Sequence, residues 1–206
     1  MADALTLSRP VSSYLSVAAR TVSDLFSPAG LAIPCVALGV WASDVPGTYR
    51  YAVLYALVAI PLPVFYVYWL VKTGRVSDFH LPDRRDRIGP FMVSILCALC
   101  AVGLLVYFGA PVVFLAPIVT ALAQTLALFL VTLAWQISIH TATTSGLVTF
   151  AVLALGGGAV AFLLLVPLVM WARLYLGRHT LAQTVAGAFL GCLIFTAMFA
   201  LRGTAW

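Results

Sequence analysis

The sequence predicts an all-α membrane protein: a helical bundle of six to seven transmembrane helices that forms a single domain over residues 1–206. Of the 206 residues, 64% are hydrophobic and only 8% are charged, and the mean hydropathy is +1.11. Soluble domains are far more polar than this. Because one membrane-spanning helix needs about 20 mostly apolar residues, the chain has room for six or seven spans and for no separate soluble domain.

The amino-terminal segment 1–26 is less apolar than the rest and carries Arg20 and Asp24. It is either a helix that lies in the membrane interface or a polar lead-in. It lacks a basic stretch followed directly by an apolar run and a small-residue cleavage site. We therefore expect no cleavable signal peptide.

Two apolar stretches follow this segment. The first covers about 27–43 and ends at Asp44, and the second covers about 51–71. Pro61 and Pro63 remove backbone hydrogen bonds within the second stretch, so we expect a kink there. Aromatic residues gather near its end, which is typical of the membrane–water interface.

The basic loop, residues 72–90, is the long polar segment of the chain and reads KTGRVSDFHLPDRRDRIGP. It holds five of the eleven basic residues and three of the six acidic ones. Its arginines either anchor the loop on the cytoplasmic side or bind an anion. Its aspartates alternate with the arginines, which favours salt bridges over a magnesium site.

Five further apolar stretches make up the second half of the chain. The pair Cys97-x-x-Cys100 lies inside the first of them without polar neighbours, so we expect buried, unreactive thiols there and no redox or metal site. The third ends where the chain turns at Gly156-Gly157-Gly158. The stretches are 91–108, 112–135, one that ends at Leu155, 159–175 and 180–201.

The order of polar and apolar segments predicts which polar residues can meet. Two spans separate the basic loop from His140, and two more separate His140 from His179. Since an even number of crossings returns the chain to the same side, we expect all three clusters at one membrane face. The glycine triplet falls on the opposite face, which indicates a turn and not a phosphate-binding loop.

Three histidines and at least four arginines would meet at this face. A guanidinium group donates two parallel hydrogen bonds to phosphate oxygens and keeps its charge. One imidazole can attack phosphorus, and a second can protonate a leaving oxygen near neutral pH. Helix starts at Thr141 and Thr180 would add backbone N–H donors for an anion. The pattern therefore predicts a site for a phosphate group.

Two motifs carry a family resemblance. Ser138-x-His140, together with Arg173-x5-His179-x3-Gln183 and the Ala-Gly pair that follows, resembles the second and third motifs of the type 2 phosphatidic acid phosphatase (PAP2) superfamily. The resemblance covers roughly residues 70–195. It implies a PAP2-like helical core and a lipid phosphatase of the bacterial type, in a multi-pass protein of a bacterial or archaeal cytoplasmic membrane. Members of this family need no cofactor and no metal.

The resemblance also implies roles for particular residues. His179 would attack phosphorus and form a phosphohistidine, His140 would protonate the leaving group, and Gln183 would orient the nucleophile. Arg173 would bind the phosphate, and Ser138 would support it. Residues of the basic loop would complete the phosphate site in place of the first motif: Arg84 and Arg87 foremost, then Arg85, His80 and Lys72.

Three positions depart from the family's motifs. Gln183 stands where the third motif ends in aspartate, so its amide oxygen can accept from the imidazole but supplies no charge. Ile139 replaces the glycine of the second motif. Phe79 stands seven residues after Lys72, where the first motif has Arg-Pro.

The sequence thus predicts a metal-independent membrane phosphatase, a phosphoric ester or diphosphate hydrolase. Its substrate would be a lipid phosphate monoester such as phosphatidic acid or an isoprenoid (di)phosphate, the latter slightly favoured by the number of arginines. The alternatives are a lipid phosphotransferase and, because of Gln183, a catalytically lapsed lipid-phosphate binder or transporter. Expected partners are this lipid and the membrane lipids, and no nucleic acid. The excess of basic residues favours a cytoplasmic site, the family resemblance an outer one, and both stay open.

Overall fold

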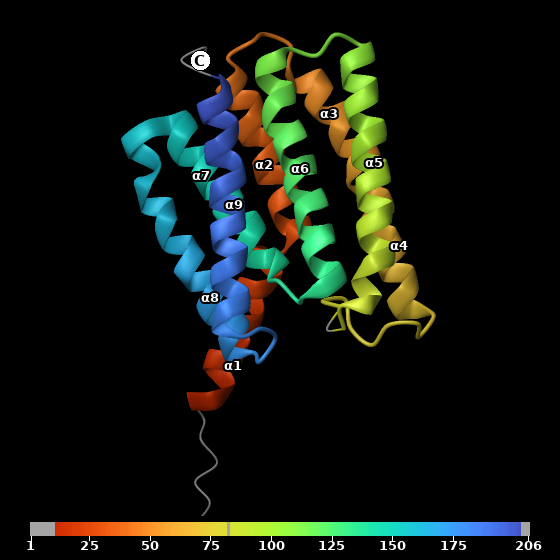
Figure 1. Ribbon diagram of the computed structural model, residues 1–206, viewed down its shortest axis with the longest axis vertical. Helices are drawn as coiled ribbons and strands as arrows, with labels where there is room; N and C mark the ends of the chain where they lie inside the picture. Colours follow the sequence, from red (N-terminus) through yellow and green to blue (C-terminus); the bar gives the residue numbers. More distant parts are fainter. Residues whose placement is uncertain (1–10, 82, 203–206) are drawn as a thin grey trace, which may run out of the picture.

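The protein is all-helical, with helices joined by loops and no strand, in the part of the chain that the computed structural model describes, residues 11–81 and 83–202. Residues 1–10 of the amino-terminal segment lie outside this part. The helices stand side by side as a bundle, with α1 and the loops that carry the polar residues at its lower end (Figure 1). In chain order they are α1 (Val11–Leu25), α2 (Pro28–Ser43), α3 (Tyr49–Ala59), α4 (Pro61–Lys72), η1 (Arg85–Arg87), α5 (Ile88–Tyr107), α6 (Val112–Ala134), α7 (Ile139–Leu155), η2 (Gly156–Leu164), α8 (Leu165–Tyr175) and α9 (Leu181–Arg202).

Five helical stretches among the described residues are long and apolar enough to cross a membrane. A sixth is obtained if α1 and α2, which bend by 49° at a short break, form one broken span. Helix α2 has only 16 residues, too few to cross a membrane unaided. The five stretches, consistent with a multi-pass membrane protein, are Tyr49–Lys72, Arg85–Tyr107, Val112–Ala134, Ile139–Tyr175 and Leu181–Leu201.

The count of five to six is lower than the six to seven expected, and the difference arises after α7. The glycine triplet separates two helices as expected, because α7 ends at Leu155 and Gly156 caps it. The 3₁₀ helix η2 starts at Gly156 and leads directly into α8, so that Ile139–Tyr175 is counted as one helical stretch of 37 residues. Gly156 has a φ of 69°, which a glycine adopts without strain. The chain reverses direction around η2, and α8 returns alongside α7 (Figure 1).

The second span contains the break that its prolines predict. Helix α3 ends at Ala59 and α4 begins at Pro61, so the expected kink is confirmed. Pro61 occupies the first position of α4, where a missing N–H costs no helical hydrogen bond. The described part of the amino-terminal segment is the helix α1, which packs against α8.

Helices α7 and α9 pack closely, and this contact brings the two sequence motifs together. A Cβ atom added at Gly187 or Gly191 would collide with atoms of α7 or of Ser138 just before it. Small residues of this kind let membrane helices approach one another. Thr141 Oγ1 donates to the Thr184 carbonyl at 3.1 Å, and Ser145 Oγ donates to the carbonyl four residues further on in α9 at 2.7 Å. The segment before α7 therefore lies beside the start of α9.

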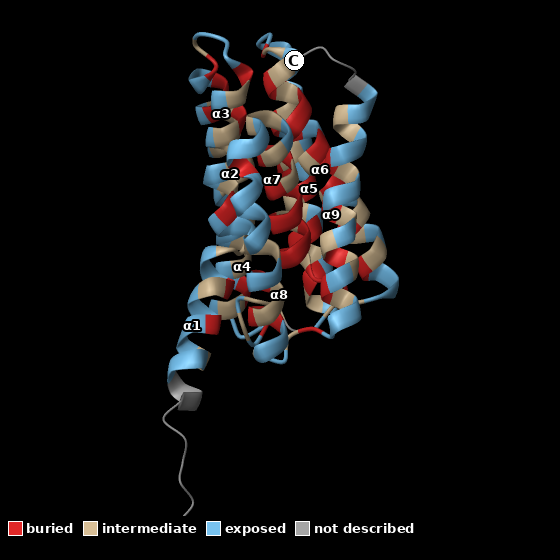
Figure 2. Ribbon diagram, turned by 90° about the vertical axis from the view of Figure 1, so that its left-hand side faces the viewer, coloured by how far each residue is buried: buried red, intermediate tan, exposed pale blue. Residues whose placement is uncertain are grey.

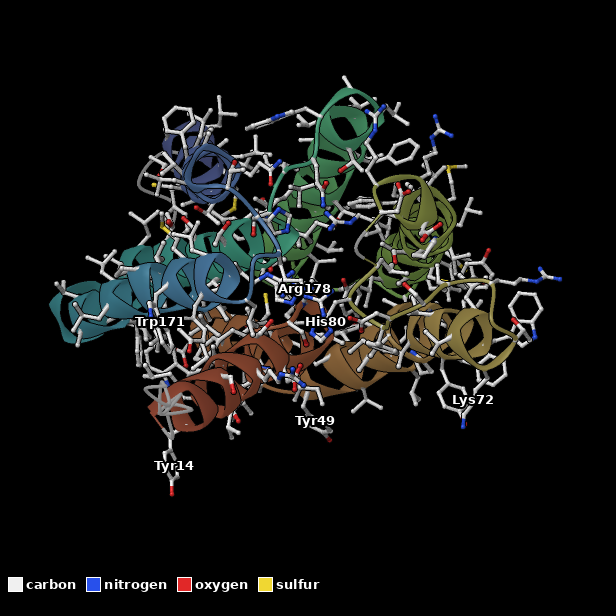
Figure 3. All side chains as sticks on the ribbon, turned by 90° about the horizontal axis from the view of Figure 1, so that it is seen from below. Tyr14, Tyr49, Lys72, His80, Trp171 and Arg178 are labelled. Atoms are coloured by element: carbon white, nitrogen blue, oxygen red, sulfur yellow. The ribbon has the colours of Figure 1, made fainter. Side chains whose placement is uncertain are left out.

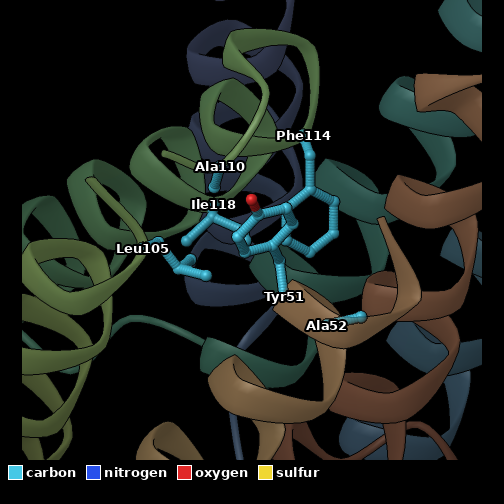
Figure 4. Packing of buried hydrophobic residues seen from close by; sticks show 6 residues of the cluster. All are labelled: Tyr51, Ala52, Leu105, Ala110, Phe114 and Ile118. Carbon is cyan, nitrogen blue, oxygen red and sulfur yellow. The ribbon is translucent and has the colours of Figure 1, made fainter. Parts of the chain in front are cut away.

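A hydrophobic cluster closes the opposite end of the bundle, where α3 meets α5 and α6 (Figure 4). Tyr51 packs there with Leu105, Phe114 and Ile118, and its hydroxyl lies 3.1 Å from the Phe108 carbonyl. Buried residues gather inside the bundle and exposed residues around it (Figure 2). Many of the exposed side chains are large and apolar, as expected of a surface that faces lipid.

Candidate functional site

A cavity of about 580 Å³ extends from the loop end of the bundle into its interior. Five predicted site residues line it: His80, Arg87, His140, Arg173 and His179. They come from separate segments, namely the basic loop, η1, α7, α8 and the loop between α8 and α9. Residues of the three polar clusters therefore meet at one end of the bundle, as the order of segments predicts. Figure 3, seen from this end, shows His80 near the centre of the protein.

The start of α9 determines the orientation of the His179 ring. Gln183 Oε1 accepts from the backbone N–H of Thr180 at 3.1 Å, and Thr180 Oγ1 accepts from the backbone N–H of Gln183 at 3.4 Å. This reciprocal pair is a capping box. The same amide oxygen lies 3.0 Å from His179 Nδ1. Because the oxygen can only accept, Nδ1 carries the proton and Nε2 keeps its lone pair.

The surroundings of His179 keep its imidazole uncharged. Burial, together with the positive charge of Arg87, lowers the pKa of His179 to about 4, although the hydrogen bond with Gln183 acts in the opposite direction. The residue is 7% exposed. At neutral pH the ring is therefore neutral, which is the state a nucleophile requires.

Arg173 is a buried cation with a free donor. It lies in the last turn of α8, is 1% exposed, and donates from Nη1 to Ser23 Oγ of α1 at 2.6 Å. Its Nε is buried and has no hydrogen-bond partner among the described residues. Such a group is costly to bury unless an acceptor satisfies it. The side chain lines the cavity, so an anion bound there would supply the acceptor.

Arg87 is a second buried cation, 3% exposed and held by backbone carbonyls. Its Nε donates to the Leu81 carbonyl at 2.8 Å and its Nη1 to the Ile137 carbonyl at 3.3 Å. These bonds join the basic loop to the segment that precedes α7. The position of the charge is therefore set by two parts of the chain.

His140 faces the cavity with an unpartnered nitrogen. Its Nε2 is buried and has no hydrogen-bond partner within residues 11–81 and 83–202. Its ring stacks on that of His80, with centroids 5.8 Å apart and planes inclined by 25°. The nitrogen is thus available to a ligand in the cavity.

His80 joins α1 to the basic loop. Its Nε2 lies 3.1 Å from an oxygen of Asp24, and its Nδ1 lies 3.3 Å from an oxygen of Asp78. Asp78 also accepts from Arg178, so the expected salt bridge involves the loop before α9 instead of an arginine of the basic loop. Burial raises the pKa of Asp78, but hydrogen bonds from His80 and Arg178 outweigh it and hold the pKa below its ordinary value.

Ser138 lies beside the site without lining the cavity. It is fully buried and caps α7, where its Oγ accepts from the backbone N–H of Thr141 at 3.5 Å. Its own backbone N–H donates to the Gln183 carbonyl at 3.2 Å. The predicted phosphate donor therefore supports the two motifs in this structure.

Three predicted basic residues also lie outside the cavity. Arg84 donates from Nη1 to the Leu133 carbonyl at 2.9 Å, and Arg85 is exposed. Lys72 Nζ lies 5.6 Å from the centroid of the Tyr68 ring, at the periphery in Figure 3. Of the arginines proposed to replace the first motif, the structure brings Arg87 to the cavity and leaves Arg84 and Arg85 outside it.

Two residues of the site were missed in the sequence. Ser23 holds Arg173, and Asp24 lines the cavity and pairs with His80. In the sequence, Ser23 and Asp24 form an adjacent polar pair at the end of an amphipathic segment. No fixed spacing relates this pair to the two motifs, so the sequence does not assign it to the site. The Thr-x-x-Gln spacing at positions 180 to 183 was a readable sign of the capping box.

Beyond its polar end the cavity is mostly apolar. Its walls there are formed by α2, α4, α5 and α6, and include Leu31, Phe91, Phe114, Ile118 and Leu128. Its volume lies within the usual range for small-molecule sites, about 300–1,000 Å³. A cationic end therefore continues into an apolar interior, an arrangement that suits an amphipathic ligand.

Comparisons of the chain with protein-family models, curated proteins and solved structures find no significant match.

Proposed function

We propose that this protein is a metal-independent membrane phosphatase that hydrolyses a lipid phosphate monoester or an isoprenoid (di)phosphate through a phosphohistidine. One observation carries the proposal. The unprotonated Nε2 of His179 and the unpartnered Nε of Arg173 belong to side chains that line the same cavity. Phosphoryl transfer to an enzyme side chain requires two groups: a nucleophile, and a hydrogen-bond donor that binds the phosphate oxygens.

The first half of the reaction forms the phosphohistidine. Arg173 and Arg87 hold the phosphate oxygens, and His179 Nε2 attacks phosphorus as the bond to the lipid oxygen breaks. Protonated His140 gives its proton to that oxygen, so the alcohol leaves neutral. The proton on His179 Nδ1 stays there throughout, donated in a hydrogen bond to Gln183 Oε1.

The second half releases phosphate. A water molecule attacks phosphorus, the bond to His179 Nε2 breaks, and neutral His140 takes the proton of the water. The products are inorganic phosphate and the alcohol, or the lipid monophosphate where the substrate is a diphosphate, and both histidines return to their starting states. The apolar part of the cavity holds the lipid chain during both steps.

Gln183 motivates two other outcomes. In a phosphotransferase, an alcohol replaces water in the second step. In a lapsed binder, the amide of Gln183 stabilises the positively charged phosphohistidine too weakly for turnover, and the cavity retains the lipid phosphate.

The test uses purified protein in detergent with phosphatidic acid, farnesyl diphosphate or undecaprenyl diphosphate, each in the presence of a metal chelator. We expect phosphate release by the wild type and by Arg85→Gln, a control outside the cavity, but not by His179→Ala. Acid-labile label on the protein from radioactive substrate would identify the intermediate. If wild type and His179→Ala release equally little, the phosphatase proposal is wrong, and lipid binding becomes the measurement.

A further inference from the structure

The positive charge inside the cavity is smaller than the sequence leads one to expect. Of the eleven basic residues, Arg87 and Arg173 line the cavity in the described part of the chain. Four other basic side chains near this face have different partners. Arg178 pairs with Asp78, Arg84 donates to a backbone carbonyl, and Lys72 and Arg75 lie over aromatic rings.

The two cavity arginines are also partly occupied. Arg87 gives two of its nitrogens to backbone carbonyls, and Arg173 gives one to Ser23. Two buried guanidinium groups match the two charges of one phosphate monoester. Among the described residues, no further arginine or lysine lines the cavity to hold a second phosphate.

The surroundings of these arginines do not favour a second phosphate. Asp24 lines the cavity, and its carboxylate would repel another anion. Away from the arginines and histidines the walls include Phe91, Ile139 and Leu128. An unpaired phosphate next to such side chains loses its hydration without gaining a partner.

We propose that the cavity selects a lipid phosphate monoester and discriminates against the diphosphate of the same alcohol. This inference rests on the proposed function, because it concerns the substrate of the same site. It follows from the charges placed inside the cavity, whereas the total number of arginines in the sequence favoured diphosphates.

The experiment compares farnesyl phosphate with farnesyl diphosphate, which differ by one phosphate on an identical chain. We expect kcat/KM to be at least about tenfold higher for the monophosphate, measured without metal in the wild type. Equal rates or a preference for the diphosphate would overturn the inference and leave the phosphatase proposal intact.

A binding measurement separates the two proposals. His179→Ala cannot form the phosphohistidine but keeps both arginines, so it should bind farnesyl phosphate at least about tenfold more tightly than farnesyl diphosphate. If the wild type hydrolyses neither lipid but this preference persists, the phosphatase proposal fails and the selectivity stands. Equal binding would contradict the selectivity.

A charge variant tests the physical cause. Asp24→Asn removes the negative charge of a residue that lines the cavity, so the preference for the monophosphate over the diphosphate should narrow by several-fold. Asp44→Asn, outside the cavity at the end of α2, is the matched control and should leave the ratio unchanged. An Asp24→Asn variant with the wild-type ratio would contradict the electrostatic basis of the inference.

Discussion

Arg173 Nη1 donates a 2.6 Å hydrogen bond to Ser23 Oγ, across 150 positions of the sequence. Both residues are 1% exposed. The bond joins α8, which carries part of the third motif, to α1, which the sequence presents as an interfacial helix or a polar lead-in. Helix α1 therefore forms part of the candidate site.

Replacing Ser23 should weaken phosphate binding. Ser23→Ala leaves a buried guanidinium nitrogen without its acceptor, at a cost of about 1 kcal/mol or more. We expect KM for the lipid phosphate to rise about three- to tenfold in Ser23→Ala, with a smaller change in kcat. Ser23→Thr keeps the hydroxyl and should have a KM near that of the wild type. Val17→Ala, exposed on the same helix, is the control. An equal loss of kcat in both Ser23 variants would instead indicate a general packing defect.

Gln183 should act through the tautomer of His179. Gln183→Leu removes the acceptor for the Nδ1 proton, so the ring can adopt the other tautomer, with the proton on Nε2. Because Nε2 is the attacking atom, we expect kcat to fall by about 10²-fold or more. Gln183→Glu keeps the length of the side chain and adds a charge that stabilises the imidazolium form. We expect it to retain activity. Steady-state kinetics of the wild type and both variants measure these effects. A Gln183→Leu enzyme with wild-type activity would show that Gln183 does not orient His179.

The pH dependence follows from the pKa of His179. Burial and Arg87 lower that pKa to about 4, so the nucleophile is neutral above about pH 4 and becomes protonated below it. We therefore expect the acidic limb of kcat/KM to lie near pH 4, well below the ordinary histidine value. Arg87→Gln removes a positive charge and should move this limb upward. A limb near pH 6.5 in the wild type would contradict the assignment of His179.

The close packing of α7 and α9 should be sensitive to a single methyl group. Gly191→Ala places a Cβ against the backbone of α7, and we expect a loss of about 1–3 kcal/mol in stability. Gly103→Ala in α5 meets no atom within 4 Å and should not destabilise, because alanine favours helix. Thermal unfolding in detergent compares the two. Equal midpoints would show that α7 and α9 can separate without cost.

Hydrophobicity and the order of segments determine much of this protein. Long apolar runs can satisfy their backbone polar groups in a membrane only as helices, so the helical class and most helix bounds could be predicted. Crossing parity places His140, His179 and the basic loop at one face. The turn after α7 could not be predicted in detail, because hydropathy indicates the helix end at Gly156 but not that the chain continues there as a 3₁₀ helix.

The tertiary structure alone decides which of many similar side chains enter the cavity. Arg84, Arg85 and Arg87 are near neighbours in the basic loop, yet the bonds to the Leu81 and Ile137 carbonyls bring Arg87 inward. Ser23 likewise lies beside Arg173 only because α1 packs against α8. Apolar periodicity is a local property of the chain and could be read from the sequence, whereas hydrogen bonds between distant segments depend on how the helices pack.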